Sequence, residues 1–339
     1  MKTYSLLLLV AITLTQCGNK KNQEPLSLSN IGVSGNQFMT NTDTITFQGL
    51  CLEDLGELDE LGHWNKNYID QAAKWNINIV RFPVHPKHWK RLGKEKYLEE
   101  LNKGVAWAKE HHLYSIIDWH VIGNMKDEKW QHPMYETTLE ETLDFWATMA
   151  NTFKDEPAVA FYELYNEPTT FSGALGEMSW AELIGIYKQI LDTVRVYDSS
   201  TVALLAGFNW AYDLRDLQTL DPQLTNVGYV SHPYPQKSEQ PWAKNWDEVF
   251  GFVAKNHPVF ATEFGFAYPD QVGAHIPVIS DDTYGQEVLD YFKTRNISYT
   301  LWVFSWHWYP TLLKDSTYTL EKGQGEFFYQ QFAKNKGRR

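Results

Sequence analysis

Residues 77–120 contain one complete strand–helix–strand pattern: Ile77-Asn78-Ile79-Val80-Arg81-Phe82-Pro83, an amphipathic segment over 97–110, and Ser115-Ile116-Ile117-Asp118-Trp119-His120. Six further β-rich runs lie at 45–49, 159–164, 202–206, 227–231, 258–262 and 298–302. Helical patterns separate most of them, at 68–74, 139–153, 181–196, 246–254 and 286–293, with a weak pattern at 214–220. Strands that alternate with helices form parallel βαβ units. Eight such units without a break in composition predict an α/β fold, a single (β/α)8 TIM barrel.

The composition of the 339 residues excludes several classes of protein. A hydrophobic fraction of 43% is sufficient for a large core. The net charge of -12 argues against a nucleic acid or an anionic membrane surface as partner, because these polyanions would be repelled. Two cysteines exclude a disulfide scaffold and a cysteine-based zinc site. An aromatic fraction of 15% fits a thick core or a surface that stacks flat, uncharged ligands.

The first residues have the pattern of an export signal. The apolar run from Leu6 to Leu14 is too short to cross a bilayer, so residues 1–16 are predicted to be a signal peptide. Leu14-Thr15-Gln16-Cys17 resembles a bacterial lipobox, which implies that Cys17 is lipidated; an ordinary cleaved signal is the alternative. We expect a tether over 17–40 and the catalytic barrel over 41–339. The second cysteine, Cys51, is expected to pack in the core.

The predicted anchor implies a location. Gly18 stands where an Asp would favour inner-membrane retention, so resemblance to sorted lipoproteins implies an outer-membrane or cell-surface lipoprotein. A periplasmic or secreted protein is the alternative. The membrane would be contacted only through the lipid on Cys17.

Polar and aromatic residues occur at the carboxyl ends of seven predicted strands. TIM-barrel active sites lie at this face. The residues are Arg81, His120, Asn166 with Glu167, Asn209 with Trp210, His232 with Tyr234, Glu263, and Trp302. Their convergence on one end of the barrel predicts a functional site there.

Two carboxylates dominate this set. Glu167 follows the fourth strand and Glu263 follows the seventh, so they face each other across the mouth of an eight-stranded ring. A facing carboxyl pair is what cleavage of a glycosidic bond requires, with one proton donor and one group at the anomeric carbon. A lone glutamate could instead be a helix cap or an ion pair, and we interpret Glu163 as a hydrogen-bonded packing residue.

From about Gly49 to Trp302, the chain resembles glycoside hydrolase family 5, the cellulase-like retaining β-glycanases. The resemblance rests on Asn166-Glu167-Pro168, on Glu263-Phe264-Gly265, and on further matches at Arg81, His120, His232-Pro233-Tyr234 and Trp302. It implies that Glu167 is the general acid/base and Glu263 the nucleophile. The retaining mechanism predicts that the two carboxyl groups lie about 5–5.5 Å apart.

The neighbouring residues have expected roles. Arg81 would keep Glu263 ionised, and Tyr234 would donate a hydrogen bond to it. Asn166 would bind the 2-hydroxyl of the sugar. His120 and His232 would bind sugar hydroxyls or the two carboxyls. Glu167 would remain protonated because burial and the second carboxylate raise its pKa.

Aromatic residues are expected to shape the cleft. Trp302 would form the floor under the reacting sugar, because an indole packs on the apolar face of a pyranose. Trp210, Trp242, Trp306 and Trp308 could extend the cleft or anchor loops, and His85 and Trp89 could reach its rim. We expect no metal and no cofactor, since His120 and His232 lie on separate strands and no His-Glu-x-x-His motif occurs.

The sequence therefore predicts a hydrolase acting on a polysaccharide or its oligosaccharides, foremost an endo-β-1,4-glucanase. A β-mannanase, a xyloglucanase or another β-glucan-specific enzyme has the same fold and is the alternative. A non-catalytic, glycan-binding surface lipoprotein is an alternative from another class, but it should have lost one of the two glutamates. A metal-dependent barrel hydrolase would need His and Asp clusters that the strand ends lack.

The anchor can be tested by one substitution. If Cys17 is lipidated, Cys17→Ala moves the protein from the membrane fraction to a soluble or unprocessed form. Fractionation followed by immunoblotting measures this distribution. Unchanged membrane association would count against the lipobox.

Overall fold

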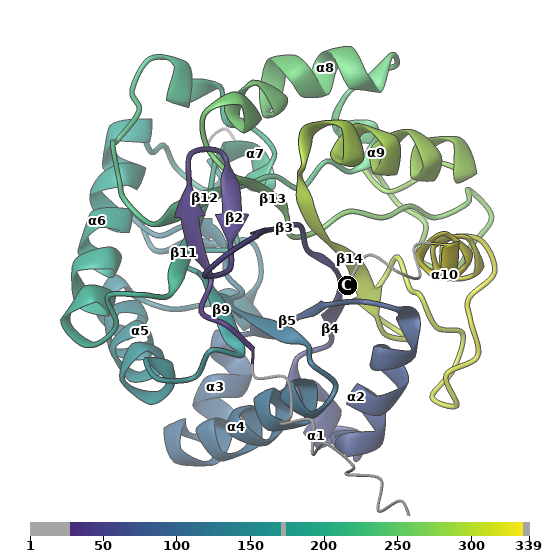
Figure 1. Ribbon diagram of the computed structural model, residues 1–339, viewed down its shortest axis with the longest axis horizontal. Helices are drawn as coiled ribbons and strands as arrows, with labels where there is room; N and C mark the ends of the chain where they lie inside the picture. The colour runs from purple at the N-terminus through teal and green to yellow at the C-terminus, as the bar shows by residue number, and fades with distance from the viewer. Residues whose placement is uncertain (1–27, 171–173, 335–339) are drawn as a thin grey trace, which may run out of the picture.

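The computed structural model describes residues 28–170 and 174–334. Eight parallel strands form a closed barrel, in which each strand pairs with the next along the chain and the last pairs with the first (Figure 1). They are β4 (Gln48–Leu52), β5 (Ile79–Val84), β6 (Tyr114–Trp119), β9 (Val159–Glu163), β11 (Val202–Ala206), β12 (Val227–Val230), β13 (Val259–Ala261) and β14 (Ser298–Phe304). The predicted (β/α)8 barrel is confirmed.

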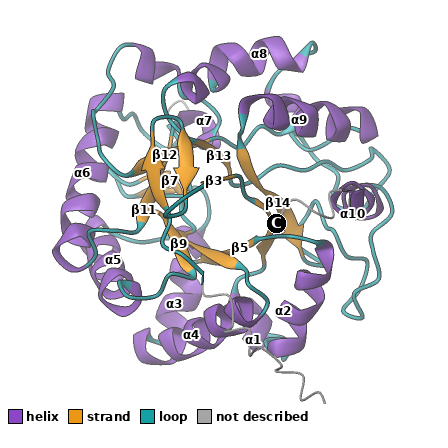
Figure 2. Cartoon of the chain, viewed as in Figure 1, coloured by secondary structure: helices purple, strands orange, loops and turns teal. Residues whose placement is uncertain are grey.

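Helices surround the barrel (Figure 2). The longer ones are α4 (Lys94–Glu110), α5 (Leu139–Phe153), α6 (Trp180–Tyr197), α9 (Asp282–Arg295) and α10 (Gln324–Lys334). Shorter ones are α1 (Leu55–Glu60), α2 (Lys66–Ala72), α3 (Pro86–Leu92), α7 (Phe208–Ala211) and α8 (Trp242–Val249). Single 3₁₀ turns are η1 (Ala73–Trp75), η2 (Pro133–Tyr135), η3 (Arg215–Gln218), η4 (Pro235–Lys237) and η5 (Gly251–Lys255). Capping boxes begin α5 at Thr138 and α6 at Ser179, which explains the sharp starts of these helices.

Some local predictions were wrong. The segment 214–220 contains only the 3₁₀ turn η3 instead of a full helix, so no long helix covers the interval between β11 and β12. The first barrel strand is β4 at 48–52 and not 45–49, because Phe47 turns into the base of the barrel. The helices α1, α3, α7 and α10 were not expected. The first two have six and seven residues, too few to show a clear helical period.

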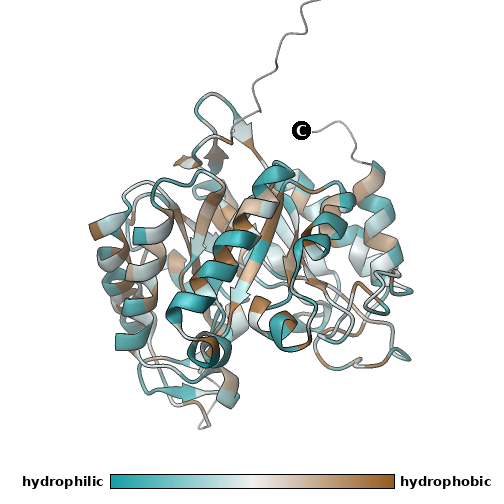
Figure 3. Cartoon of the chain, turned by 90° about the horizontal axis from the view of Figure 1, so that it is seen from below, coloured by the Kyte–Doolittle hydropathy of each residue, from teal (hydrophilic) through white to brown (hydrophobic). Residues whose placement is uncertain are grey.

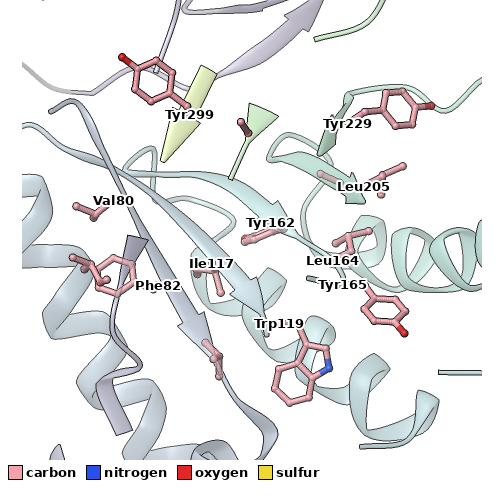
Figure 4. Close-up of a cluster of buried hydrophobic side chains, with 14 of the residues drawn as sticks. Val80, Phe82, Ile117, Trp119, Tyr162, Leu164, Tyr165, Leu205, Tyr229 and Tyr299 are labelled. Carbon is pink, nitrogen blue, oxygen red and sulfur yellow. The ribbon is translucent and has the colours of Figure 1, made fainter. Parts of the chain in front are cut away.

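The larger hydrophobic core lies between the barrel and the helices. Side chains that point outward from neighbouring strands meet the helices there, and Val80, Phe82, Ile117, Trp119 and Tyr162 are among them (Figure 4). In Figure 3 the strands inside are mostly brown, and the outer helices carry teal patches. Full burial of one such side chain contributes about 1.5–3 kcal/mol, so this layer is the main source of stability.

The amino-terminal end of the barrel is closed by a small antiparallel sheet of β1 (Gly32–Ser34), β2 (Gln37–Met39) and β3 (Thr44–Ile45). Phe38 packs edge-on against Phe161 inside the barrel, with ring centroids 4.8 Å apart. Figure 1 shows β2 lying across this opening. The tether expected over 17–40 is therefore wrong for residues 28–40, which belong to the folded domain. The predicted signal peptide, Cys17 and residues 17–27 lie outside the described residues.

Alternation along the strands divides the barrel interior into two layers. Ile79, Phe161 and Phe260 point into the apolar layer near the closing sheet. Two residues further along the same strands or just beyond them, Arg81, Glu163 and Thr262 form a buried polar layer. The site is built on this polar layer, at the open carboxyl end. Among the helices of 28–170 and 174–334, none has the length and apolar character needed to cross a membrane.

Candidate active site

Arg81 of β5 lies at the centre of the site. Its side chain is fully buried, and Nε donates to Glu163 Oε2 at 2.7 Å. One terminal nitrogen donates to Glu263 Oε1 at 2.9 Å. The other donates to Asn166 Oδ1 at 2.7 Å and lies 2.9 Å from Asp118 Oδ2. One guanidinium therefore orients three carboxyl groups and an amide that come from different strands.

The charges explain the ionisation of this layer. Burial by itself would lower the pKa of Arg81, but Asp118, Glu163 and Glu263 raise it well above the usual value. Burial raises the pKa of Asp118 well above its ordinary range despite Arg81. For Glu163, burial is outweighed by Arg81 and His232, and its pKa is lowered. Arg81 thus remains a cation. Of the two carboxyl groups Asp118 and Glu163, Asp118 is the one whose pKa is raised and which therefore holds a proton more readily.

Glu167 and Glu263 face each other across His232. Nδ1 of His232 lies 2.8 Å from Glu167 Oε1 and 3.8 Å from Glu263 Oε2. One oxygen of each carboxyl and the imidazole nitrogen all lie within 4.8 Å of one another. This separation agrees with the short spacing of retaining glycosidases and is below the roughly 6.5–9.5 Å of inverting ones. Both glutamates are buried, with exposed fractions of 7% and 4%.

Backbone pairing fixes the position of Glu167. The short strand β10 (Glu167–Pro168) pairs with β7 (Ile122–Asn124), which also pairs with β8 (Lys129–Trp130). The amide of Glu167 donates to the carbonyl of Val121 at 3.1 Å. This small sheet at the carboxyl end holds Glu167 on a strand and not on a loose loop.

Protonation of the pair differs from the expectation. Burial raises the pKa of Glu167, but the bond from His232 and the charge of Lys237 outweigh it, so the pKa is lowered. Burial raises the pKa of Glu263, and the charge of Glu167 adds to this against His232 and Arg81. Burial would lower the pKa of His232, but the charge of Glu263 and the bonds to Glu163 and Glu167 raise it. The prediction that Glu167 has a raised pKa was therefore wrong, because the hydrogen bond with His232 and the charge of Lys237 outweigh burial.

Two expected supports of Glu263 are in place. Arg81 contacts Oε1, and the hydroxyl of Tyr234 donates to Oε2 at 3.2 Å. His120 Nδ1 lies 3.9 Å from Oε1 and contacts Asp118 Oδ2 at 2.6 Å. Glu263 is thus held by donors on both oxygens.

Asn166 is positioned to bind a ligand. Its side-chain oxygen accepts from Arg81. Its buried Nδ2 makes no hydrogen bond within the described residues. Because buried amide groups are nearly always satisfied, this donor is available for a hydroxyl of a substrate.

Stacked rings form one wall of the site. Trp302 is half-buried and lies parallel to His120, with ring centroids 5.5 Å apart and an interplanar angle of 8°. Trp308 stacks on Trp302 at 5.9 Å. A flat apolar surface of this kind suits the C–H face of a sugar ring.

The three other tryptophans named as possible cleft residues differ in their exposure. Trp210 is partly exposed and donates to Gln131 Oε1 at 2.6 Å, and Trp306 packs edge-on against His63. Of the two roles left open for Trp242, the structure excludes an extension of the cleft, because Trp242 is 5% exposed and stacks on Trp246 in the core.

The two residues expected at the rim of the cleft, Trp89 and His85, have different surroundings. Trp89 was wrongly placed there, since it packs between Tyr97 and Phe145. His85 is buried beside His120, at 4.5 Å between ring centroids, and contacts Asp54 at 2.8 Å. It therefore packs against the side of the site and is not an exposed residue of the rim.

Four residues of the site were missed. Asp118 was read only as part of a strand, Cys51 only as a core residue, and Thr262 and Lys237 were not considered. Thr262 donates to Glu163 Oε1 at 2.8 Å, and Arg81 contacts Cys51 Sγ at 3.3 Å. The two-residue alternation that places Arg81 inside the barrel could also have identified Asp118, two residues before His120.

Lys237 contributes a positive charge near the pair. Its Nζ donates to the carbonyl of Trp210 at 2.6 Å. Burial lowers its pKa to about 8, although the charges of Glu167 and Glu263 act in the opposite direction. No local sequence pattern marks this lysine, because its approach depends on the path of the loop after β12.

Comparison with known proteins agrees with the resemblance to glycoside hydrolase family 5. The family described as cellulase, glycosyl hydrolase family 5, matches residues 40–307. The solved β-glucanase SdGluc5_26A from Saccharophagus degradans is 40% identical, with a TM-score of 0.89, covering 92% of this chain and 95% of that one. Its structure has also been determined in complex with cellotetraose.

More distant relatives are longer proteins. An endoglucanase from Clostridium saccharobutylicum is 24% identical over 316 residues, covering 89% of this chain and 64% of that protein. Endoglucanase N from Pectobacterium atrosepticum is 22% identical over 305 residues, covering 87% and 63%. The chain spans less than two thirds of the length of these curated relatives.

The contact between Tyr234 and Glu263 gives a prediction with a defined sign. A hydrogen bond donated to the charged form of a carboxyl lowers its pKa, so Tyr234→Phe raises the pKa of Glu263. A bond to a charged group contributes about 1.5–3 kcal/mol, which corresponds to about 1–2 pH units. If ionised Glu263 is required, the acidic limb of the pH profile of kcat/KM on a soluble β-glucan moves to higher pH. Tyr229→Phe, a buried tyrosine of β12, is the control; an unmoved limb in Tyr234→Phe would contradict the assignment.

Proposed function

Because the chain belongs to the cellulase family, glycosyl hydrolase family 5, we propose that it is a retaining endo-β-1,4-glucanase. The observation that carries the proposal is the buried pair of Glu167 and Glu263, with oxygens within 4.8 Å across His232. The β-glucanase from Saccharophagus degradans supports a β-glucan as substrate, and its complex with cellotetraose supports an oligosaccharide in the cleft. The net charge of -12 suits a neutral glycan better than a polyanion.

The contacts assign the roles of the two carboxylates. Glu263 receives hydrogen bonds on both oxygens, from Arg81 and Tyr234, which favour the ionised form against the burial and the charge of Glu167 that raise its pKa. An oriented carboxylate of this kind is suited to attack the anomeric carbon. Glu167 contacts His232 through one oxygen and lies on the opposite side of the pair. It is therefore the group that donates a proton to the departing oxygen.

In the first step, Glu263 forms a bond to the anomeric carbon while the bond to the leaving oxygen breaks. Glu167, which shares a proton with His232, supplies that proton to the leaving oxygen. In the second step, Glu167 takes a proton from water, and the water oxygen displaces Glu263 from the sugar. Glu263 is a neutral ester between the steps, so its negative charge no longer acts on Glu167. Loss of that charge lowers the pKa of Glu167 and makes it a base at the stage where a base is needed.

Other site residues bind the sugar. Trp302 offers an apolar face, and the free Nδ2 of Asn166 is positioned for a hydroxyl near the reacting carbon. Hydrogen bonds to the 2-hydroxyl strengthen as the transition state forms, so Asn166 contributes to rate as well as to binding. Specificity for β-mannan or xyloglucan is the alternative within the family. A glycan-binding protein without turnover is disfavoured by the presence of both glutamates in contact with their supports.

We also propose that the protein is exported and anchored by lipid at Cys17. This proposal is supported by the sequence of residues 1–17 alone, which lies outside the described residues. An anchored enzyme of this kind would act on glycans outside the cytoplasm.

Stereochemistry tests the proposed function. Two successive inversions leave the anomeric configuration unchanged, so hydrolysis of cello-oligosaccharides first releases β-configured product. Proton NMR of the earliest product reads the anomer before mutarotation. A panel with β-mannan, xyloglucan and mixed-linkage β-glucan identifies the preferred chain. An initial α signal, or no hydrolysis of any β-glucan, would refute the proposal.

The roles of the two glutamates separate kinetically. Glu263→Ala loses nearly all turnover on every substrate, because no glycosyl-enzyme intermediate forms. Glu167→Ala loses activity on oligosaccharides by about 10²–10⁴-fold but keeps much of the first step on activated aryl glycosides, whose leaving groups need little protonation. Steady-state and burst kinetics on both substrate types measure the difference. Equal losses on both types would reject Glu167 as the acid.

A further inference from the structure

A second group of ionisable side chains lies outside the site, where α1 and α3 approach the segment after β14. It consists of Glu53, Glu57, Glu60, His88 and His307, and we call it the α1–α3 cluster. Glu57 Oε2 lies 3.0 Å from His88 Nε2, and Glu57 Oε1 lies 3.9 Å from His307 Nε2. His307 Nε2 also lies 3.0 Å from Glu53 Oε1. The cluster thus contains two imidazoles and three carboxyls in a continuous chain of contacts.

Three of these residues have the arrangement of metal ligands. Glu57, Glu60 and His88 each offer one ligand atom, and all three atoms lie within 4.8 Å of one another. Glu57 and Glu60 are three residues apart on α1, which puts them on one face of the helix. His88 lies in the first turn of α3 and faces them. Two elements separate in sequence therefore present their donors to one point.

The buried members of the cluster lack hydrogen bonds. His88 is fully buried, and within the described chain neither of its ring nitrogens makes a hydrogen bond. Neither carboxyl oxygen of the fully buried Glu53 makes a hydrogen bond of good direction either, although Oε1 lies 3.0 Å from His307 Nε2. Buried polar atoms are nearly always satisfied, so orphaned atoms in such a cluster indicate a missing partner. The contact between His88 Nε2 and Glu57 has the distance of an ion pair but not the direction of a hydrogen bond.

The position of His88 suits metal binding. Its imidazole is fully buried and lies 3.0 Å from Glu57, so it is directed at the two carboxylates of α1. One contact competes for the site: Arg91 Nε lies 3.6 Å from Glu60 Oε2. This distance is long for an ion pair, and the exposed Glu60 can turn away from it.

We propose that Glu57, Glu60 and His88 bind a divalent cation, and that the cation is Zn²⁺. One imidazole nitrogen with two carboxylate oxygens is a donor set that zinc accepts, whereas calcium and magnesium prefer oxygen alone. His307 Nε2 lies 3.9 Å from the other oxygen of Glu57 and is not one of the three converging ligands. Bonds of about 2.0–2.2 Å require the donors to close to roughly 3.3 Å from one another. The side chain of Glu60, which is 53% exposed, has the freedom to make that movement.

The position of the site gives the ion a structural role. Helix α1 has only six residues and is too short to be stable by itself. A zinc ion would connect it to α3, and it would fix Glu57, which also contacts His307 in the segment that carries Trp308. Since Trp308 stacks on Trp302, the ion would hold one wall of the cleft. This role does not depend on which glycan the protein cleaves.

Another trio has to be distinguished in any experiment. Glu167, His232 and Glu263 also place ligand atoms within 4.8 Å of one another. A cation bound there would occupy both carboxylates and stop hydrolysis. Binding at the α1–α3 cluster leaves them free.

Calorimetry tests the inference. The untagged chain is treated with EDTA, desalted and titrated with zinc chloride. We expect one equivalent to bind, and the double variant Glu57→Gln/Glu60→Gln to weaken the dissociation constant by at least about tenfold. His88→Gln weakens it in the same way. His257→Gln is the matched control, because this partly exposed histidine has a carboxylate partner, Asp221, outside the cluster. The control keeps the affinity of the wild type.

Thermal unfolding and activity complete the experiment. One equivalent of zinc raises Tm in the wild type and in His257→Gln, but not in the double variant, and hydrolysis continues. Absence of binding to the wild type would overturn the inference, as would a double variant that binds zinc equally well. Loss of hydrolysis with the first equivalent would place the ion at Glu167, His232 and Glu263 and would also overturn it. Because calorimetry and Tm need no substrate, these results stand apart from those that test the proposed hydrolase activity.

Discussion

The buried guanidinium of Arg81 is the contact on which the site depends. It binds Glu163 and Glu263, lies against Asp118, and holds the oxygen of Asn166. These partners belong to β9, the end of β13, β6 and the segment after β9, so one side chain of β5 joins the barrel across its interior. Breaking a buried ion pair by removing one partner costs about 3–5 kcal/mol, because the other charge remains buried and unpaired. Loss of the cation that orients Glu263 would therefore also destabilise the fold.

This polar layer can exist because the other end of the barrel is closed. Phe38 of the amino-terminal sheet packs against Phe161, and the apolar layer separates Arg81 from water on that side. On the open side, His232 provides a second junction, since it contacts Thr262 and Glu167. The charges are thus exposed to substrate from one direction only. In such an enclosed site, fixed donors act more strongly on developing charge than they would in water.

The sequence predicted the barrel because strands and helices are marked by local periods. Burial of alternating or helical positions depends on residues two to four apart, which can be read from the chain. The facing glutamates followed, because in a closed ring the fourth and seventh strands have known places. The three strands of the closing sheet were missed, since each has only two or three residues and shows no period. The sequence left open whether Trp242 lines the cleft, because the direction of its ring depends on how α8 packs against its neighbours.

What the sequence by itself determined is the fold class, the end of the barrel that carries the site, and the two glutamates. What only the tertiary structure decided is the pattern of contacts and charges around them. Arg81 and Glu263 are 182 positions apart, and His232 and Glu167 are 65 apart. No local period relates such residues, because their distance is set by closure of the ring and by the course of the loops. The lowered pKa of Glu167 depends on these long-range contacts with His232 and Lys237, so it had to come from the folded chain.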